Sequence, residues 1–246
     1  MPRFFVDSTL AAGDILTLPD EVARHVQVLR LQAGDALTLF NGQGGQHAAR
    51  LVEVGRRNAL VEIGAHEGVE AEPPYCVTLA QGIAGGDKMD WLIEKAVELG
   101  VTQIAPLVTA RGVVRLSAER AARRHAHWQG IVRAACEQCG RNRLPEVEPA
   151  HDLSRWFDAS PAAGNPNALR LMLSPRASLS FDALPGTPPS AGVVLLIGPE
   201  GGLSPDEEAA AAAHGFSGLS LGSRVLRTET AGIAVLAALA ARWGGW

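Results

Sequence analysis

The sequence predicts an α/β protein with a mainly parallel sheet, preceded by a small β domain. From residue 75 onward, short apolar runs alternate with segments of helical periodicity, which is typical of parallel strands joined by helices. Before that point, several short apolar runs surround a single helical pattern. Residues 70–74 end in Pro-Pro after a glutamate-rich turn, and such a stretch predicts a stiff linker. We therefore expect domains at residues 1–72 and 73–246.

The first domain is expected to form a small barrel of short strands. The run Asn41-Gly42-Gln43-Gly44-Gly45 predicts a hairpin turn between two of these strands. One amphipathic helix is predicted over residues 20–31, with Asp20 as its cap. The expected strands, rich in β-branched and aromatic residues, cover residues 3–6, 36–40, 48–54 and 59–63.

The second domain begins with regular strand and helix alternation. Strands are predicted over residues 75–83, 102–108 and 168–173. Helices are predicted from Asp87 to about residue 100, over 117–139 and over 150–157. Gly140 is expected to end the long helix, because glycine is common just after a helix C-terminus.

The C-terminal fifty residues contain two strand–loop–helix units. The first joins the apolar run 193–197 to the loop Gly198-Pro199-Glu200-Gly201-Gly202. Its helix should begin at Ser204, because Ser, Pro and Glu occupy the positions of a capping box. The second joins a strand over 219–222 to a helix capped by Thr228 or Thr230.

These two units imply that both loops lie at the carboxyl edge of one parallel sheet. Open α/β sheets bind ligands at that edge, and glycine lets the backbone approach a ligand closely. A single glycine loop is equally explained as a tight connection. The second loop, however, also carries Arg224, Arg227 and Glu229, and the combination favours a binding site.

Composition points to a cytosolic protein with one basic zone. The chain has 246 residues, a net charge of −4, three cysteines and no apolar leader segment at its start. Residues 111–143, however, contain eight arginines and only two acidic residues. Such a zone on an acidic protein can direct RNA to one face. The alternative is a solvated helix face.

Cys136 and Cys139 have the spacing of a metal or redox motif. No second pair accompanies them, and the nearest histidines, His125 and His127, precede them on the same predicted helix. We therefore expect these cysteines to pack inside the protein, and we predict no metal site.

Six motifs are spread over nearly the whole chain: Gly86-Asp87-Lys88-Met89, Glu94-Lys95, Glu98-Leu99-Gly100-Val101, Cys136-Glu137-Gln138-Cys139-Gly140-Arg141-Asn142-Arg143, Ile197-Gly198-Pro199-Glu200-Gly201-Gly202 and Leu221-Gly222-Ser223-Arg224-Val225-Leu226-Arg227-Thr228-Glu229-Thr230-Ala231. Together these motifs resemble those of the RsmE family, whose members are SPOUT-superfamily methyltransferases that modify N3 of a uridine in small-subunit ribosomal RNA. Ser223 departs from the family pattern, which usually has Pro there.

The resemblance implies a PUA-like β-barrel that contacts RNA, followed by a SPOUT domain with a C-terminal deep trefoil knot. It also implies S-adenosylmethionine as cofactor, 16S ribosomal RNA as substrate with the family's target uridine 1498, a role in ribosome biogenesis, and a homodimer. The residues that it places around the cofactor are Leu173, Ile197, Gly198, Glu200, Gly201, Gly202, Leu221, Gly222, Val225 and Leu226.

Methylation at uridine N3 requires the loss of a weakly acidic proton, so the site needs an acceptor or a positive charge. Arg141 is the first candidate for holding the uracil oxygens or a flanking phosphate. Arg227 and Glu229 are the next candidates, and Glu229 can also simply complement a helix N-terminus. The predicted RNA contacts are Arg120, Arg123, Arg124 and Arg143.

Two other classes of function are compatible with parts of the sequence. A non-catalytic RNA-binding module would use the first domain and the basic zone, but it would leave the paired glycine loops without a role. A nucleotide-dependent oxidoreductase would suit the α/β pattern, but the Gly-x-Gly-x-x-Gly fingerprint follows none of the predicted strands. Assembly is suggested independently by the last helix, which is apolar nearly all round and needs cover on more than one side.

Overall fold

The computed structural model describes residues 1–113, 117–159 and 167–246. The chain forms two compact units. The first contains residues 1–72 together with 133–144, and the second contains 73–132 and 145–246. The chain divides after Glu72, and the segment 133–144, which was expected in the second domain, groups with the first unit.

The first unit is built on a five-stranded sheet in the order β1-β3-β4-β5-β2. Only the β1–β3 pair is parallel. Helix α1 (Asp20–Val28) buries Val22, Ala23 and Val26 against the sheet. The strands are β1 (Arg3–Phe5), β2 (Ile15–Thr17), β3 (Ala36–Phe40), β4 (Gln46–Val54) and β5 (Ala59–Glu67).

Two details of this unit differ from the sequence prediction. Strand β2 was not predicted, because three residues are too few to show an alternating pattern. Helix α1 has Pro19 as its N-cap residue, so Asp20 lies in the first turn, and the helix ends at Val28 and not near residue 31 as predicted.

Polar contacts explain why the segment 133–144 belongs to the first unit. The buried side chain of Asn142 accepts a hydrogen bond from Arg3 Nη2 at 2.7 Å and donates one to the Val69 carbonyl at 2.6 Å. Glu137 Oε1 accepts a hydrogen bond from the backbone N–H of Phe5 at 2.8 Å. The segment therefore satisfies backbone groups of the first unit that would otherwise be unpaired.

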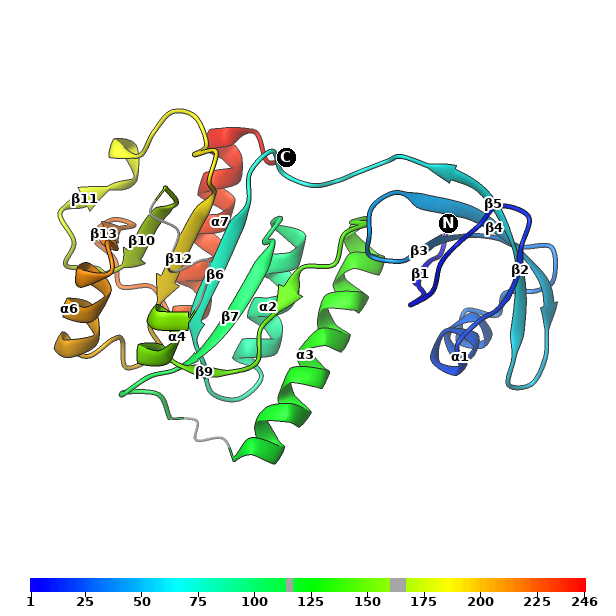
Figure 1. Ribbon diagram of the computed structural model, residues 1–246, viewed down its shortest axis with the longest axis horizontal. Helices are drawn as coiled ribbons and strands as arrows, with labels where there is room; N and C mark the ends of the chain where they lie inside the picture. The colour runs from blue at the N-terminus through cyan, green and yellow to red at the C-terminus, as the bar shows by residue number, and fades with distance from the viewer. Residues whose placement is uncertain (114–116, 160–166) are drawn as a thin grey trace. The chain divides into compact units, whose positions relative to one another are not determined.

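The second unit contains an eight-stranded sheet in the order β11-β13-β10-β12-β6-β7-β8, with β9 also paired to β7 (Figure 1). Every pair of adjacent strands is parallel. The strands are β6 (Val77–Gly82), β7 (Gln103–Val108), β8 (Glu146–Val147), β9 (His151–Asp152), β10 (Leu169–Leu173), β11 (Leu179–Ser180), β12 (Val193–Ile197) and β13 (Ser217–Ser220).

Helices cover both faces of this sheet. Helices α2 (Lys88–Glu98) and α7 (Thr228–Trp243) pack against each other on one face. On the other face, α4 (Leu153–Ala159) and α6 (Pro205–Ala213) enclose a core that includes Trp156, Phe157 and Phe216. A short 3-10 helix, η1 (Phe181–Ala183), precedes β12, and the long helix α3 (Ala118–Cys139) contributes residues to both units.

The predicted fold class, α/β with a mainly parallel sheet, is confirmed by this arrangement. Strands β12 and β13 lie on either side of β10, so the two glycine loops that follow them meet at one edge of the sheet. The capping box at Ser204 and Glu207 is formed as predicted. The deep trefoil knot stays a prediction. Within the described residues, no helix is long and apolar enough to span a membrane.

Candidate functional site

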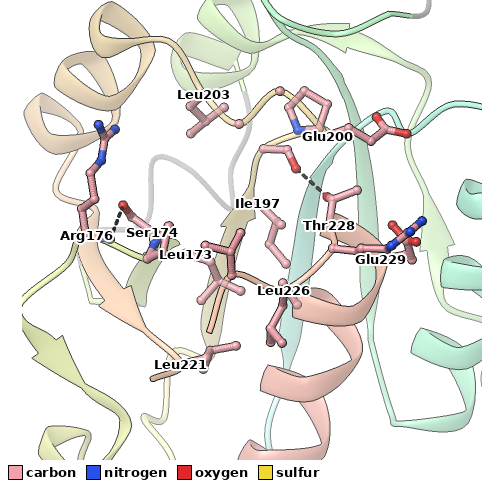
Figure 2. A pocket seen from close by; sticks show the side chains of 18 of the residues that line it. Leu173, Ser174, Arg176, Ile197, Glu200, Leu203, Leu221, Leu226, Thr228 and Glu229 are labelled. Carbon is pink, nitrogen blue, oxygen red and sulfur yellow. Dashed lines mark hydrogen bonds between the residues drawn. The ribbon is translucent and has the colours of Figure 1, made fainter. Parts of the chain in front are cut away.

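A cavity of about 650 Å³ opens at the carboxyl ends of β10, β12 and β13, beside the first turn of α7. Its size falls in the range of about 300–1,000 Å³ that is common for small-molecule sites. Figure 2 shows how Leu173, Ile197, Leu221 and Leu226 surround it. All ten residues predicted to bind the cofactor line this cavity, as do Arg227 and Glu229.

The loop after β12 is held tightly against its neighbours. A Cβ at Gly198 would lie 2.7 Å from the backbone nitrogen of Leu203, so this position requires glycine. A Cβ at Gly82, at the end of β6, would lie 2.6 Å from Pro199. The N–H of Gly202 donates to the Pro199 carbonyl at 2.8 Å and closes the turn. The glycines of this loop therefore allow close packing against the protein's own backbone, whereas close approach to a ligand stays a prediction.

Glu200 fastens the same loop to the connection between β6 and α2. Its Oε1 accepts hydrogen bonds from Lys88 Nζ at 2.7 Å and from the backbone N–H of Gly85 at 3.0 Å. Burial opposes ionisation of this carboxyl group, but hydrogen bonds from Lys88 and the backbone outweigh burial and place the pKa of Glu200 below its ordinary value. Glu200 thus lines the cavity as an ionised anchor of the loop.

Arg111 is a pocket residue that the sequence did not identify as such. Its Nη1 donates to the carbonyl oxygens of Gly201 at 3.3 Å and Leu203 at 3.1 Å. A Cβ at Gly201 would lie 3.0 Å from Arg111 Cβ. Gly201 therefore faces Arg111, and its lack of a side chain allows the arginine to pack against the loop. Arg111 appeared in sequence only as one member of the basic zone.

Thr228 connects the second loop to the first. It was a candidate N-cap of the last helix, but Arg227 is the N-cap residue and Thr228 begins the helix. The Thr228 hydroxyl donates to the carbonyl oxygen of Gly198 at 2.6 Å, drawn as a dashed line in Figure 2. Gly222, at the other end of the second loop, has φ +105°, which favours glycine.

The charged groups around the cavity divide into paired and unpaired ones. Lys88 pairs with Glu200, and Arg176 pairs with Glu208 at 3.1 Å. Among the residues that the structure describes, Arg224 and Arg227 have no ion-pair partner and are exposed. Glu229 Oε2 is buried and has no hydrogen-bond partner within the same described part of the chain. The site therefore presents both cationic and anionic groups to a ligand.

Arg141, the first candidate for catalysis, does not line this cavity. Its guanidinium belongs to the first unit, is 3% exposed, and donates from Nε to Glu72 Oε1 at 3.0 Å. Arg143 also lies in the first unit, where its Nε is 3.5 Å from Glu70 Oε1. Arg141 was a candidate because it lies in a family motif. A motif carries no information about whether a side chain is buried.

The predicted RNA contacts Arg120, Arg123 and Arg124 lie in the first turns of α3. Arg123 forms an exposed ion pair with Glu119 at 2.6 Å, while Arg120 is also exposed. Arg115, another member of the basic zone, lies outside the described residues. An exposed ion pair contributes little to stability, so these side chains remain accessible to a polyanion.

The two clustered cysteines differ in environment. Cys136 is buried, and burial raises the pKa of its thiol to about 12. Cys139 is half-buried, and Cys76 is exposed. In residues 1–113, 117–159 and 167–246 there is no group of three or more His, Cys, Asp or Glu side chains arranged to hold a metal ion.

The fold and the cavity agree with comparisons to known families. Residues 71–240 match the RNA methyltransferase domain family, and residues 18–64 match the RNA methyltransferase PUA domain. These matches define the class as an RNA methyltransferase with a PUA domain. The chain belongs to the ribosomal RNA small subunit methyltransferase E family.

Three similar proteins match over nearly their whole length. The ribosomal RNA small subunit methyltransferase E of Buchnera aphidicola subsp. Schizaphis graminum is 31% identical over 99% of this chain and 97% of its own. The enzyme from Neisseria gonorrhoeae, solved with S-adenosyl methionine, is 40% identical with a TM-score of 0.90, covering 99% and 98% of the two chains. A putative methyltransferase from Legionella pneumophila, solved with the same cofactor, is 39% identical with a TM-score of 0.91, covering 97% and 96%. The predicted RsmE membership and methyltransferase class are confirmed.

Proposed function

We propose that the protein transfers a methyl group from S-adenosylmethionine to N3 of one uridine in 16S ribosomal RNA, the family's uridine 1498. The observation that carries this proposal is the glycine-lined cavity, which contains every residue predicted to contact the cofactor. Relatives with about 40% identity hold S-adenosylmethionine. Ribosomal RNA of the small subunit is the partner, and the cytoplasm is the compartment in which this substrate is assembled.

The cavity suits the cofactor in shape and chemistry. Its apolar wall, formed by Leu173, Ile197 and Leu226, offers a surface for a flat adenine ring. The backbone of the two glycine loops supplies N–H and C=O groups that can bind the polar edge of the ring. Glu229 Oε2 is buried and has no hydrogen-bond partner among the described residues, so it remains an acceptor for the N3–H of a uracil ring that enters beside the cofactor.

The residues of the second loop can serve the chemistry at the uridine. When bound, S-adenosylmethionine supplies an electrophilic methyl group on a sulfonium sulfur. Uridine N3 must lose its proton before or as the N–C bond forms and the S–C bond breaks. Both Glu229 and Arg227 line the cavity; Glu229 is our candidate acceptor for this proton, and Arg227 is our candidate for stabilising the negative charge that develops on the uracil oxygens. The competing role for Glu229 is complementing the first turn of α7.

The test combines cofactor binding with mapping of the product. Calorimetric titration of the purified protein with S-adenosylmethionine should show one site per chain. Incubation with small ribosomal subunits that lack the modification should place one methyl group on uridine N3, as read by mass spectrometry. Glu229→Gln should lower kcat far more than it changes cofactor affinity, because the amide cannot accept the proton. Methyl transfer to a carbon or a ribose oxygen would overturn the assignment of N3.

The homodimer is also part of this proposal. One face of α7 remains half-exposed and carries the alanine row Ala234, Ala237 and Ala238. Small side chains permit another helix to approach closely, and a twofold-related copy would cover this face. Sedimentation at low concentration should give the mass of two chains. A monomer with full specific activity would contradict the dimer.

A further inference from the structure

Gln81 is a buried polar residue beneath the cofactor cavity. It lies near the end of β6, beside Ile197 in the neighbouring strand β12, and is 0% exposed. Its Nε2 donates to the Gly82 carbonyl at 2.9 Å and to the Thr228 hydroxyl oxygen at 2.8 Å, with the Gly198 carbonyl at 3.5 Å. Because carbonyl oxygens only accept, these neighbours fix which end of the amide faces the loop.

The hydrogen bonds run in one direction through Thr228. Its hydroxyl has a single proton, which it donates to the Gly198 carbonyl at 2.6 Å. The oxygen of Thr228 is therefore the acceptor for Gln81. This chain of donors joins three segments that are distant in sequence: the end of β6, the first turn of α7 and the loop after β12. Thr228 and Gly198 line the cavity, whereas Gln81 does not.

The oxygen of the Gln81 amide, Oε1, indicates that this side chain does more than stabilise the core. Its Oε1 is buried and has no hydrogen-bond partner within the described part of the chain. A buried acceptor left unpaired is destabilising, so a hydrophobic residue of similar length would suit the core better. What the amide provides, and a hydrophobic residue would not, is the donor that orients Thr228.

We propose that Gln81 is a positioning residue for the cofactor cavity, acting through Thr228 to fix the Gly198 carbonyl and the first turn of α7. The inference rests on the proposed binding of S-adenosylmethionine in this cavity. Without the Gln81 donor, the Thr228 hydroxyl can rotate to another acceptor, and the Gly198 peptide loses the hydrogen bond that holds its plane. Loop and helix would then have to be ordered by the cofactor itself, which weakens binding.

The experiment measures cofactor affinity and thermal stability of Gln81→Met side by side. We expect S-adenosylmethionine to bind roughly tenfold more weakly, the effect of about one hydrogen bond, while the melting temperature stays at or above that of the parent. Thr78→Val is the matched control, because Thr78 is also a buried polar residue of β6 and its hydroxyl donates to Gln103 Oε1 at 3.1 Å, away from the cavity. The control should retain the parent's cofactor affinity.

Two further variants test whether Gln81 acts through the hydroxyl of Thr228. The double variant Thr228→Val with Gln81→Met should bind the cofactor as tightly as whichever single variant binds it more weakly. The losses should not add, because both changes break the same series of hydrogen bonds. In Gln81→Glu, affinity should rise as the pH falls, since only the protonated carboxyl can donate to Thr228. A Gln81→Met protein that binds the cofactor as tightly as the parent, or fully additive losses in the double variant, would overturn the positioning role. A parent protein that does not bind the cofactor would instead overturn the proposed function.

Discussion

Arg141 Nε lies 3.0 Å from Glu72 Oε1, and the guanidinium of Arg141 is buried in the first unit. Arg141 was a candidate for catalysis because it lies in a family motif, but it forms an ion pair inside the first unit. This pair joins the segment 133–144 to Glu72, at the end of the first stretch of that unit. Removing one partner of such a pair leaves a buried charge without compensation.

We expect Arg141→Met to destabilise the protein by about 3 kcal/mol, the lower end for a buried pair, because the partly buried Glu72 carboxylate loses its partner. Denaturant unfolding measures this loss. The double variant Arg141→Met with Glu72→Leu should recover part of it, since neither charge then remains. Cofactor affinity should be unchanged in both variants, because Arg141 does not line the cavity. A stable Arg141→Met protein that has lost methyl transfer would return this residue to the chemistry.

Glycine substitutions should separate backbone strain from steric conflict. Gly222→Ala places a side chain at φ +105° and should weaken cofactor binding by distorting the second loop. Gly201→Val should weaken cofactor binding through steric conflict, because a Cβ at position 201 would lie 3.0 Å from Arg111 Cβ and would push Arg111 away from the loop. Gly130→Ala, in open space on α3, is the control and should stabilise the protein by about 0.5–1 kcal/mol. Calorimetry and thermal melts of the three variants provide the comparison. Unaltered binding in Gly222→Ala would remove this loop from the site.

The basic end of α3 should contribute to RNA affinity. Arg124→Glu is expected to weaken binding to ribosomal RNA and to reduce the slope of log K against log salt by about 1, the value for one phosphate contact. Arg155→Glu is the matched control, because Arg155 is an exposed arginine of α4 outside the basic zone. RNA binding of the parent and both variants, measured at several salt concentrations, gives the slopes to compare. Equal slopes for both variants would mean that the zone is only a solvated helix face.

Thiol labelling should distinguish Cys76 from Cys136. Cys76 is exposed and should react with iodoacetamide at pH 8, whereas Cys136 should react only when the protein unfolds, because burial raises the pKa of its thiol to about 12. The fold favours the neutral thiol, so its contribution to stability is complete below the unfolded-state pKa and is lost as the pH rises towards 12. Cys136→Ala should reduce this alkaline loss. Equal native labelling rates for Cys76 and Cys136 would contradict the burial argument.

The sequence by itself determined the longer strands and helices, and it placed both glycine loops at one edge of the sheet. Those features depend on neighbours along the chain: apolar periodicity, the capping box at Ser204 and Glu207, and glycines after apolar runs. Strand β8 was not predicted, because two residues carry no period. The predicted helix over residues 150–157 was wrong at its start, where residues 151 and 152 form β9 and the helix α4 begins at Leu153. The identity of β8 and β9 comes only from pairing with β7.

Only the tertiary structure decided which of the conspicuous residues belong to the site. Arg141 and Arg227 are both arginines in motifs, yet one is paired inside the first unit and the other lines the cavity. Gln81 and Thr228 are 147 residues apart, and nothing local in either segment indicates their hydrogen bond. Such contacts arise when the parallel register sets β6 beside β12 and packs α7 across them. Local patterns encode secondary structure, whereas burial and long-range partners are settled by how those elements pack.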